Sequence, residues 1–134
     1  MNHYPQVLIA DDDAGVRKIL VSIVQNTLPS AKVTAVENGK QGLESFRRHG
    51  ADLVISNFIM PEMDGPSFVE TLRKDGEEVP IIMVSGSSEA EALGKLAGID
   101  SFVKKLEIMT ELPRQIRTLM GENRVLCLNR FLHG

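Results

Sequence analysis

The sequence predicts an α/β protein, a doubly wound parallel sheet built from five successive βα units. Short apolar segments rich in β-branched residues alternate with longer segments in which apolar residues recur at helical spacing. The strand segments are apolar without alternation, as expected for strands covered on both faces. A chain of 134 residues is long enough for one domain with a substantial core.

The first two units occupy the N-terminal half of the chain. QVLIA at residues 6 to 10 is expected as a buried strand, and the helix after it ends at Pro29. KVTAV at residues 32 to 36 is expected as the second strand, with a helix that stops near Gly50. Each unit therefore ends at a residue that disfavours helix.

Three further units follow. DLVIS at residues 52 to 56 is expected as the third strand, followed by a loop over residues 61 to 65 and a helix that ends at Asp75. The remaining strands and helices are expected at residues 80 to 84, 88 to 97, 101 to 104 and from 108 onward. Parallel strands need right-handed crossovers, so the helices are expected on both faces of the sheet.

Composition excludes several functions. No apolar run is long enough to cross a bilayer and the N-terminus lacks a signal-peptide pattern, so we expect a cytoplasmic protein without membrane contact. A net charge of -3 argues against direct nucleic-acid binding by this domain. Cys127 is the single cysteine, and three scattered histidines lack ligand spacing, which excludes disulfides and cysteine-based zinc sites.

Polar residues follow four of the five predicted strands. They are Asp11, Asp12 and Asp13, then Asn57, then Ser85, then Lys104 and Lys105. In a doubly wound sheet the functional site lies beyond the carboxyl ends of the strands. Paired carboxylates are typical of Mg²⁺ sites, and a lysine with a hydroxyl supplies donors to a phosphoryl group. The pattern predicts a phosphate site.

Each of these residues also has a purely structural alternative. Asp13 and its neighbours are typical helix N-caps and first-turn acids, and Ser85 is a typical capping residue. The two lysines are typical of solvated surface charge. The convergence of all of them on one edge of the sheet is what favours a functional site.

The residues resemble the receiver domains of two-component response regulators, over roughly residues 5 to 120. The motifs that carry the resemblance are ADDD (10 to 13), ISNFIMPEMDG (55 to 65), MVSG (83 to 86) and GIDSFVKK (98 to 105). The resemblance implies a flavodoxin-like fold with strand order 2-1-3-4-5, which is one of the two common orders of doubly wound sheets. It also implies a signalling module and not an enzyme.

The resemblance assigns roles to individual residues. The metal ligands it implies for Mg²⁺ are Asp11, Asp12, Asn57 and the Ile59 carbonyl. The phosphoryl pocket it implies consists of Asn57, Ser85 and Lys105. Counting without a gap from Gly98 selects Lys105 over Lys104 as the pocket lysine. Leu106 stands where the family usually has proline, so we expect a trans peptide and a rearranged loop there.

Asn57 occupies the position that corresponds to the family's phosphoacceptor aspartate. An amide carries no charge and its nitrogen lone pair is delocalised, so it is not a nucleophile for phosphorus. We therefore expect a pseudo-receiver that is not phosphorylated, through a natural loss or an engineered Asp→Asn change. With one negative charge fewer, we expect Mg²⁺ binding to be weak or absent.

The resemblance also implies a switch and partners. Ser85 and Phe102 correspond to the mobile pair that links the pocket to the output face, which comprises the fourth helix, fifth strand and fifth helix. The partners implied are a sensor histidine kinase or phosphotransfer protein and a downstream effector or output domain. A homodimer through the output face is a further expectation.

The sequence divides into a receiver-like domain at residues 1 to 121 and an apolar extension at residues 122 to 134. Val125, Leu128 and Leu132 in the extension keep helical spacing, so it either continues the last helix or contacts a partner. A frayed terminus is the alternative.

Three rival functions remain. A Mg²⁺-dependent phosphatase or hydrolase on the same fold would use Asp11 or Asp12 as its nucleophile. A flavin-binding module would need a phosphate-cradling loop where the chain has three aspartates, which would repel phosphate. An interaction adaptor with a vestigial site differs from the receiver only in whether metal and phosphoryl analogues bind.

Overall fold

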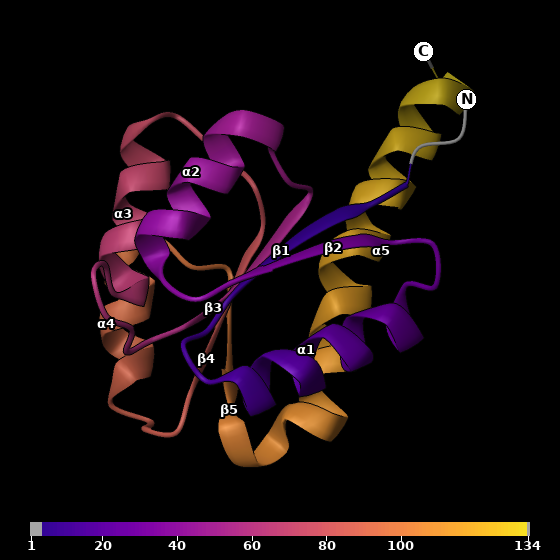
Figure 1. Cartoon of the computed structure of the whole chain (residues 1–134). Coiled ribbons are helices and arrows are strands. Elements are labelled where there is room, and N and C mark those ends of the chain that lie inside the picture. The colour runs from indigo at the N-terminus through magenta and orange to yellow at the C-terminus, as the bar shows by residue number, and fades with distance from the viewer. Residues whose placement is uncertain (1–3, 134) are drawn as a thin grey trace.

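The computed structural model describes residues 4 to 133, and the side chains of residues 4 to 121. Five parallel strands form one sheet in the order β2-β1-β3-β4-β5 (Figure 1), which confirms the predicted fold class and strand order. The strands are β1 (Gln6–Ala10), β2 (Lys32–Val36), β3 (Leu53–Asn57), β4 (Ile81–Ser85) and β5 (Ser101–Lys104).

Helices cover both faces of this sheet. In Figure 1, α1 and α5 lie on one face, and α2, α3 and α4 lie on the other. The helices are α1 (Ala14–Thr27), α2 (Gly39–His49), α3 (Gly65–Lys74), α4 (Ala90–Ala97) and α5 (Ile108–His133), with a short 3-10 helix, η1 (Lys105–Glu107). Because β1 connects outward to β2 across one face and α2 returns to β3 across the other, the strand order reverses between β1 and β3.

Side-chain alternation along the strands divides the interior into two cores. In β1, Val7 and Ile9 pack with α1 and α5, while Leu8 and Ala10 pack with α2 and α3. All five residues of β3 are buried, and so are all five of β4. The central strands are therefore rigidly held, which fixes the positions of the residues at their carboxyl ends.

Two strands are shifted by one residue from their predicted positions. β3 begins at Leu53 and ends with Asn57, and β4 begins at Ile81 and ends with Ser85. Asn57 pairs with Val84 in the parallel register, so the ladder extends one residue further than the apolar run. Asn57 and Ser85 are therefore the last residues of their strands, and their backbones are held by the sheet.

One helix start also differs from the predicted one. The fourth helix begins at Ala90 instead of residue 88, because the Ala90 amide bonds to the Ser87 carbonyl in a preceding turn. After β5 the chain forms η1 before α5, and within the described residues no peptide bond is cis, including the bond before Leu106.

The last helix, α5, runs from Ile108 to His133. The backbone thus continues as a helix beyond residue 121. The predicted apolar contacts of Val125, Leu128 and Leu132 lie outside the described side chains. Among the residues that the structure describes, no helix is sufficiently long and apolar to span a bilayer.

Candidate functional site

The candidate site lies at the carboxyl ends of β1 and β3, where the strand order reverses. Asp11 and Asp12 follow β1, and Asn57 ends β3, the neighbouring strand. A hydrogen bond joins the two strand ends directly, from Asn57 Nδ2 to Asp12 Oδ1 at 3.3 Å. The structure thus brings together three of the residues that the sequence singled out.

Asp11 is fully buried, with 0% of its surface exposed. Its Oδ1 atom accepts a hydrogen bond from the Asp13 backbone amide at 2.9 Å, whereas Oδ2 has no hydrogen-bond partner among the described residues. Burial raises the pKa of this carboxyl above its ordinary value, while the Asp13 amide and the Lys105 charge act in the opposite direction. Asp11 is a desolvated acid with one unmet oxygen.

The other two aspartates have different environments. Asp12 is exposed at the mouth of the site, where its Oδ1 atom meets the Asn57 amide. Asp13 is the N-cap of α1, and its Oδ1 atom accepts from the Val16 amide at 3.0 Å. The structural alternative therefore holds for Asp13, and it leaves Asp11 and Asp12 as the acids of the site.

Asn57 is only 5% exposed and its side-chain nitrogen makes two hydrogen bonds. Besides the contact with Asp12, Nδ2 donates to the Ile59 backbone carbonyl at 2.8 Å. The amide thus lies between a carboxylate and a carbonyl, two groups that can only accept hydrogen bonds. Its position links β3, the loop after β3 and the acidic turn after β1.

The N-terminus of α3 packs directly against the backbone of Asn57. Asp64 caps this helix by accepting from the Ser67 amide at 2.9 Å. A Cβ atom on Gly65 would lie 2.3 Å from the Asn57 carbonyl oxygen, so only glycine allows the helix to approach this closely. The Gly65 amide also donates to the Phe58 carbonyl at 2.9 Å, which closes the loop between β3 and α3.

The remaining predicted site residues come from β4 and β5. Ser85 is buried at the end of β4, and its Oγ accepts from the Ser87 amide at 3.2 Å. Lys105, the first residue of η1, is half-buried and its charge acts on Asp11, while Lys104 is exposed. Phe102 is half-buried in β5 and packs against the core on the α2 to α4 side of the sheet.

Sequence reasoning missed Arg17, which supports the acidic turn from α1. Its Nη1 atom donates to the Asp11 backbone carbonyl at 2.8 Å, and its Nη2 atom lies 3.9 Å from Glu37 Oε1. The guanidinium thereby holds the turn after β1 against the end of β2. Its position four residues after the N-cap was the available signal, since such a side chain reaches back over the helix start.

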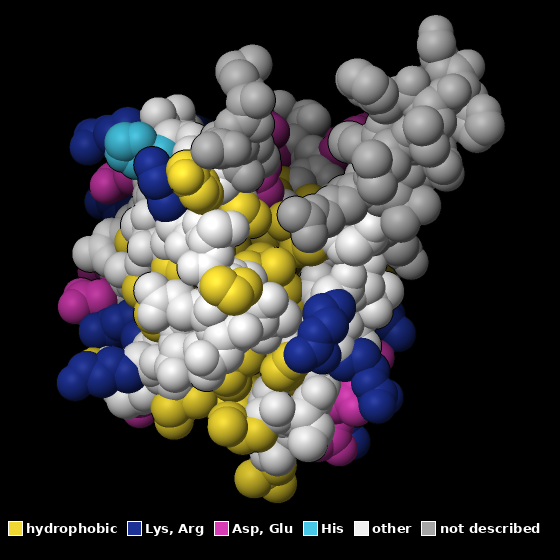
Figure 2. Space-filling view, turned by 90° about the vertical axis from the view of Figure 1, so that its right-hand side faces the viewer, with side chains coloured by type: hydrophobic (Ala, Val, Ile, Leu, Met, Phe, Trp, Pro, Cys, Tyr) yellow, Lys and Arg dark blue, Asp and Glu magenta, His cyan; other side chains and the backbone are white. Residues whose placement is uncertain are grey.

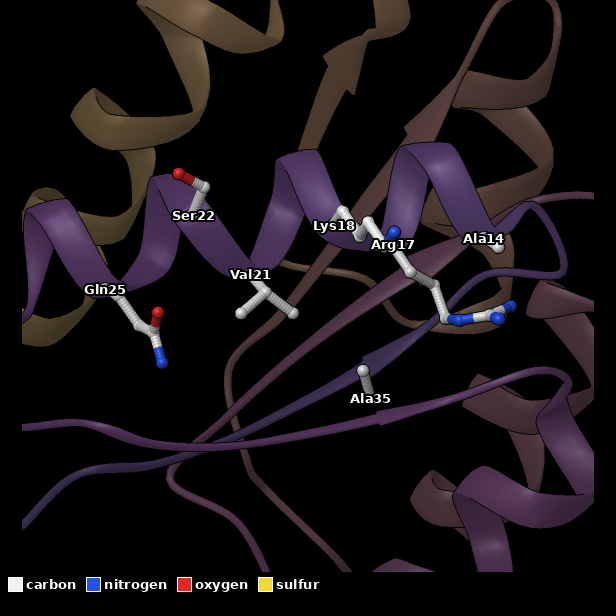
Figure 3. Close-up of a pocket in the computed structure, with 7 residues that line it drawn as sticks. All are labelled: Ala14, Arg17, Lys18, Val21, Ser22, Gln25 and Ala35. Atoms are coloured by element: carbon white, nitrogen blue, oxygen red, sulfur yellow. The ribbon is translucent and has the colours of Figure 1, made fainter.

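A separate hollow of about 350 Å³ lies between α1 and β2. Figure 3 shows Val21 of α1 and Ala35 of β2 on its walls, with the longer polar side chains of α1 around them. None of the predicted site residues lines this hollow. It adjoins the site at the strand ends through Arg17, which lines the hollow and bonds to the Asp11 carbonyl. Within the described part of the chain, no group of three histidine, cysteine, aspartate or glutamate residues could hold a metal.

Comparison with known proteins identifies the family and several relatives of this chain. A family model described as response regulator receiver domain matches residues 7–117. The chain is 32% identical over 121 residues to the probable transcriptional regulator ycf27 of Porphyra purpurea, which covers 89% of this chain and 49% of the relative. It is 40% identical over 106 residues to a protein-glutamate methylesterase/protein-glutamine glutaminase of a Nocardioides species, covering 75% of this chain and 28% of that protein.

The chain thus spans about half the length, or less, of these curated relatives. Among solved structures, the receiver domain of Francisella response regulator 1452 matches with a TM-score of 0.77 and 27% identity, covering 89% of this chain and 98% of that one. The response regulator domain of Thermotoga maritima CheB matches with a TM-score of 0.77 at 22% identity, covering 89% and 98%. At 22% identity, the match to the CheB domain shows similarity of fold alone.

Proposed function

Because the chain belongs to the response regulator receiver domain family, we propose that it is a receiver whose phosphoacceptor position is held by Asn57. Such a module is not phosphorylated by the family's usual route and signals through protein contacts. The proposal covers either origin of the asparagine, a natural loss or an engineered Asp→Asn change. It describes a signalling module without catalytic turnover of its own.

The observation that carries this proposal is the position of Asn57. Its side chain lies at the carboxyl end of the central strand β3, beside Asp12, at the point where the strand order reverses. A carboxylate here could attack phosphorus, whereas an amide has no charge and no available lone pair on nitrogen. Asp11, Asp12, Ser85 and Lys105 stand at the positions that the resemblance assigns to them, so the asparagine at residue 57 is by itself enough to prevent phosphorylation in this proposal.

The test is intact mass after incubation with acetyl phosphate and MgCl₂, for the unmodified chain and for Asn57→Asp. We expect only Asn57→Asp to gain the mass of a phosphoryl group. Asn38→Asp is a matched control, because Asn38 is also a buried asparagine beyond a strand end, where it caps α2 through the Gln41 amide. Phosphorylation of the unmodified chain, or equal labelling of both variants, would refute the assignment.

We place the output contacts on the surface formed by α4, β5 and α5, with Ser85 and Phe102 as the link to the pocket. On α4, Leu93 and Leu96 are 54% and 84% exposed, and they lie three residues apart, so they are neighbours on the surface of the helix that a partner could cover. If this surface forms a homodimer, Leu96→Glu should abolish concentration-dependent sedimentation while Ile19→Glu on α1 should not. Unchanged sedimentation of Leu96→Glu would remove dimerisation from the proposal.

The partners we propose are a sensor histidine kinase or phosphotransfer protein and a downstream effector or output domain, in the cytoplasm. Figure 2 shows apolar side chains exposed between charged ones on the side of the molecule that includes α1 and α5. Large apolar residues exposed in the described part include Ile19 of α1 and Met109 of α5.

Replacing Phe102 with alanine should alter effector binding. Unchanged binding would refute the proposed link between the pocket and the output surface.

No observation favours the alternative of a hydrolase. Asp11 is fully buried, and Asp12 is engaged by the Asn57 amide. A nucleophilic carboxylate needs access to the phosphorus atom, which burial of Asp11 denies. Measurable hydrolysis of a phosphate ester that is lost in Asp12→Asn would revive this reading.

A further inference from the structure

The Asn57 amide nitrogen contacts the same groups that the family resemblance assigns to the metal ion. Nδ2 lies 2.8 Å from the Ile59 carbonyl oxygen and 3.3 Å from Asp12 Oδ1. These two oxygens, together with an oxygen on residue 57, are three of the four ligands that the resemblance implies for Mg²⁺, and Asp11 is the fourth. A hydrogen-bond donor therefore takes up oxygen atoms that would otherwise coordinate a cation.

The chemistry of the neighbours determines which end of the amide faces them. The Ile59 carbonyl oxygen and Asp12 Oδ1 both accept hydrogen bonds from Nδ2, so the nitrogen end of the amide faces them. If Oδ1 faced them instead, three oxygens would converge without a hydrogen atom or a cation between them. A hard cation requires that second arrangement, because Mg²⁺ coordinates oxygen. With the Asn57 nitrogen facing Asp12 and the Ile59 carbonyl, these three residues do not form a Mg²⁺ site.

We propose that the Asn57 side-chain amide replaces the divalent cation of this pocket. Its two N–H groups join the acidic turn after β1 to the loop after β3, so the pocket is held closed without metal. Mg²⁺ then has to displace the amide from both oxygens before it can bind. Asn57 is thus a competitor of the metal and a positioning residue for the pocket, beyond its inability to accept a phosphoryl group.

One neighbouring atom favours a cation. Asp11 Oδ2 is buried and lacks a partner among the described residues, and an unmet buried carboxylate oxygen is costly. The Lys105 charge acts on the same carboxyl and compensates it in part. The unmet Asp11 oxygen favours a cation and the Asn57 amide opposes it, so the experiment measures the affinity for Mg²⁺ directly.

The experiment compares Mg²⁺ affinity, by calorimetric titration with MgCl₂, in the unmodified chain, Asn57→Ala and Asn57→Asp. If the amide competes with the metal, Asn57→Ala frees Asp12 and the Ile59 carbonyl and binds Mg²⁺ at least as tightly as the unmodified chain. If Asn57 were a weak metal ligand, the same variant would bind more weakly. Asn57→Asp adds a charge beside the ion and should bind more than about tenfold tighter than the unmodified chain.

Weaker binding by Asn57→Ala than by the unmodified chain would overturn the proposal. If neither binds measurably, or if Asn57→Ala fails to fold, amide NMR of the unmodified chain decides. In EDTA, the Asn57 Nδ2 protons should exchange with water more slowly than those of the exposed Asn26. Exchange in EDTA as fast as that of Asn26 would overturn the proposal.

This inference rests on the proposed receiver pocket, but the two fail separately. Phosphorylation of the unmodified chain would refute the proposed function, whatever its metal affinity. A chain that is not phosphorylated but binds Mg²⁺ through Asn57 would retain the proposed function and lose the inference.

Discussion

Gly65→Ala should destabilise the protein and displace Asn57. The added Cβ atom would lie 2.3 Å from the Asn57 carbonyl oxygen, 3.1 Å from the Phe58 Cα atom and 3.1 Å from the Met83 Cε atom. Only the methionine is flexible enough to move aside. Relief of the first contact requires α3 to shift away from the end of β3, which also strains the hydrogen bond from the Gly65 amide to Phe58.

The magnitude follows from two terms. Overpacking against a rigid neighbour costs about 1–3 kcal/mol, and a weakened backbone hydrogen bond adds about 1 kcal/mol. We expect a loss of roughly 3 kcal/mol in the free energy of unfolding, which corresponds to a decrease of roughly 10 °C in Tm for a domain of this size. Urea denaturation followed by circular dichroism gives the free energy directly, and thermal melting gives Tm.

Gly86→Ala is the matched control. Gly86 follows the neighbouring strand β4 at the same edge of the sheet, and a Cβ atom there would meet nothing within 4 Å. Its free energy of unfolding should change by less than about 0.5 kcal/mol. If Gly65→Ala were as stable as Gly86→Ala, the close approach of α3 to Asn57 would be wrong, and with it the account of how Asn57 is held.

Two further perturbations test the supports of the fold and the site. Arg73→Ala removes the donors that bond to the carbonyls of residues 77, 79 and 98 and to the Asp100 carboxylate. Because this network is partly exposed, we expect the free energy of unfolding, measured by urea denaturation, to fall by about 2 kcal/mol. Exposed Arg48→Ala should change stability by less than about 0.5 kcal/mol, and an equal effect of both would contradict the network. Burial raises the pKa of the Asp11 carboxyl in the folded state. The native protein therefore binds the proton of this carboxyl more tightly than the unfolded chain does. The free energy of unfolding should then fall as pH rises from about 4 through the folded-state pKa. Asp11→Asn should therefore gain in Tm relative to the unmodified chain as pH rises from about 4 to about 7 in EDTA, and a constant difference would contradict the raised pKa.

Local patterns in the sequence were enough to locate the strands and helices, because a strand buried on both faces leaves an uninterrupted apolar run. The exact ends of the strands were harder to predict. Asn57 and Ser85 are polar, so the pattern placed them after their strands, whereas the parallel ladder extends to include both. The register of neighbouring strands decides such boundaries, and single segments do not carry that information.

The sequence by itself determined which chemical groups converge, since residues at the carboxyl ends of parallel strands must share one edge of the sheet. It identified Asp11, Asp12 and Asn57 as neighbours, with Asp12 as the direct metal ligand that the family resemblance implies, but it gave no difference in burial between the two acids. Only the tertiary structure separates a fully buried Asp11 from an exposed Asp12, and only it shows the Asn57 nitrogen bonded to Asp12 and to the Ile59 carbonyl. Burial and side-chain orientation depend on groups from several elements at once, so they are decided when the chain packs.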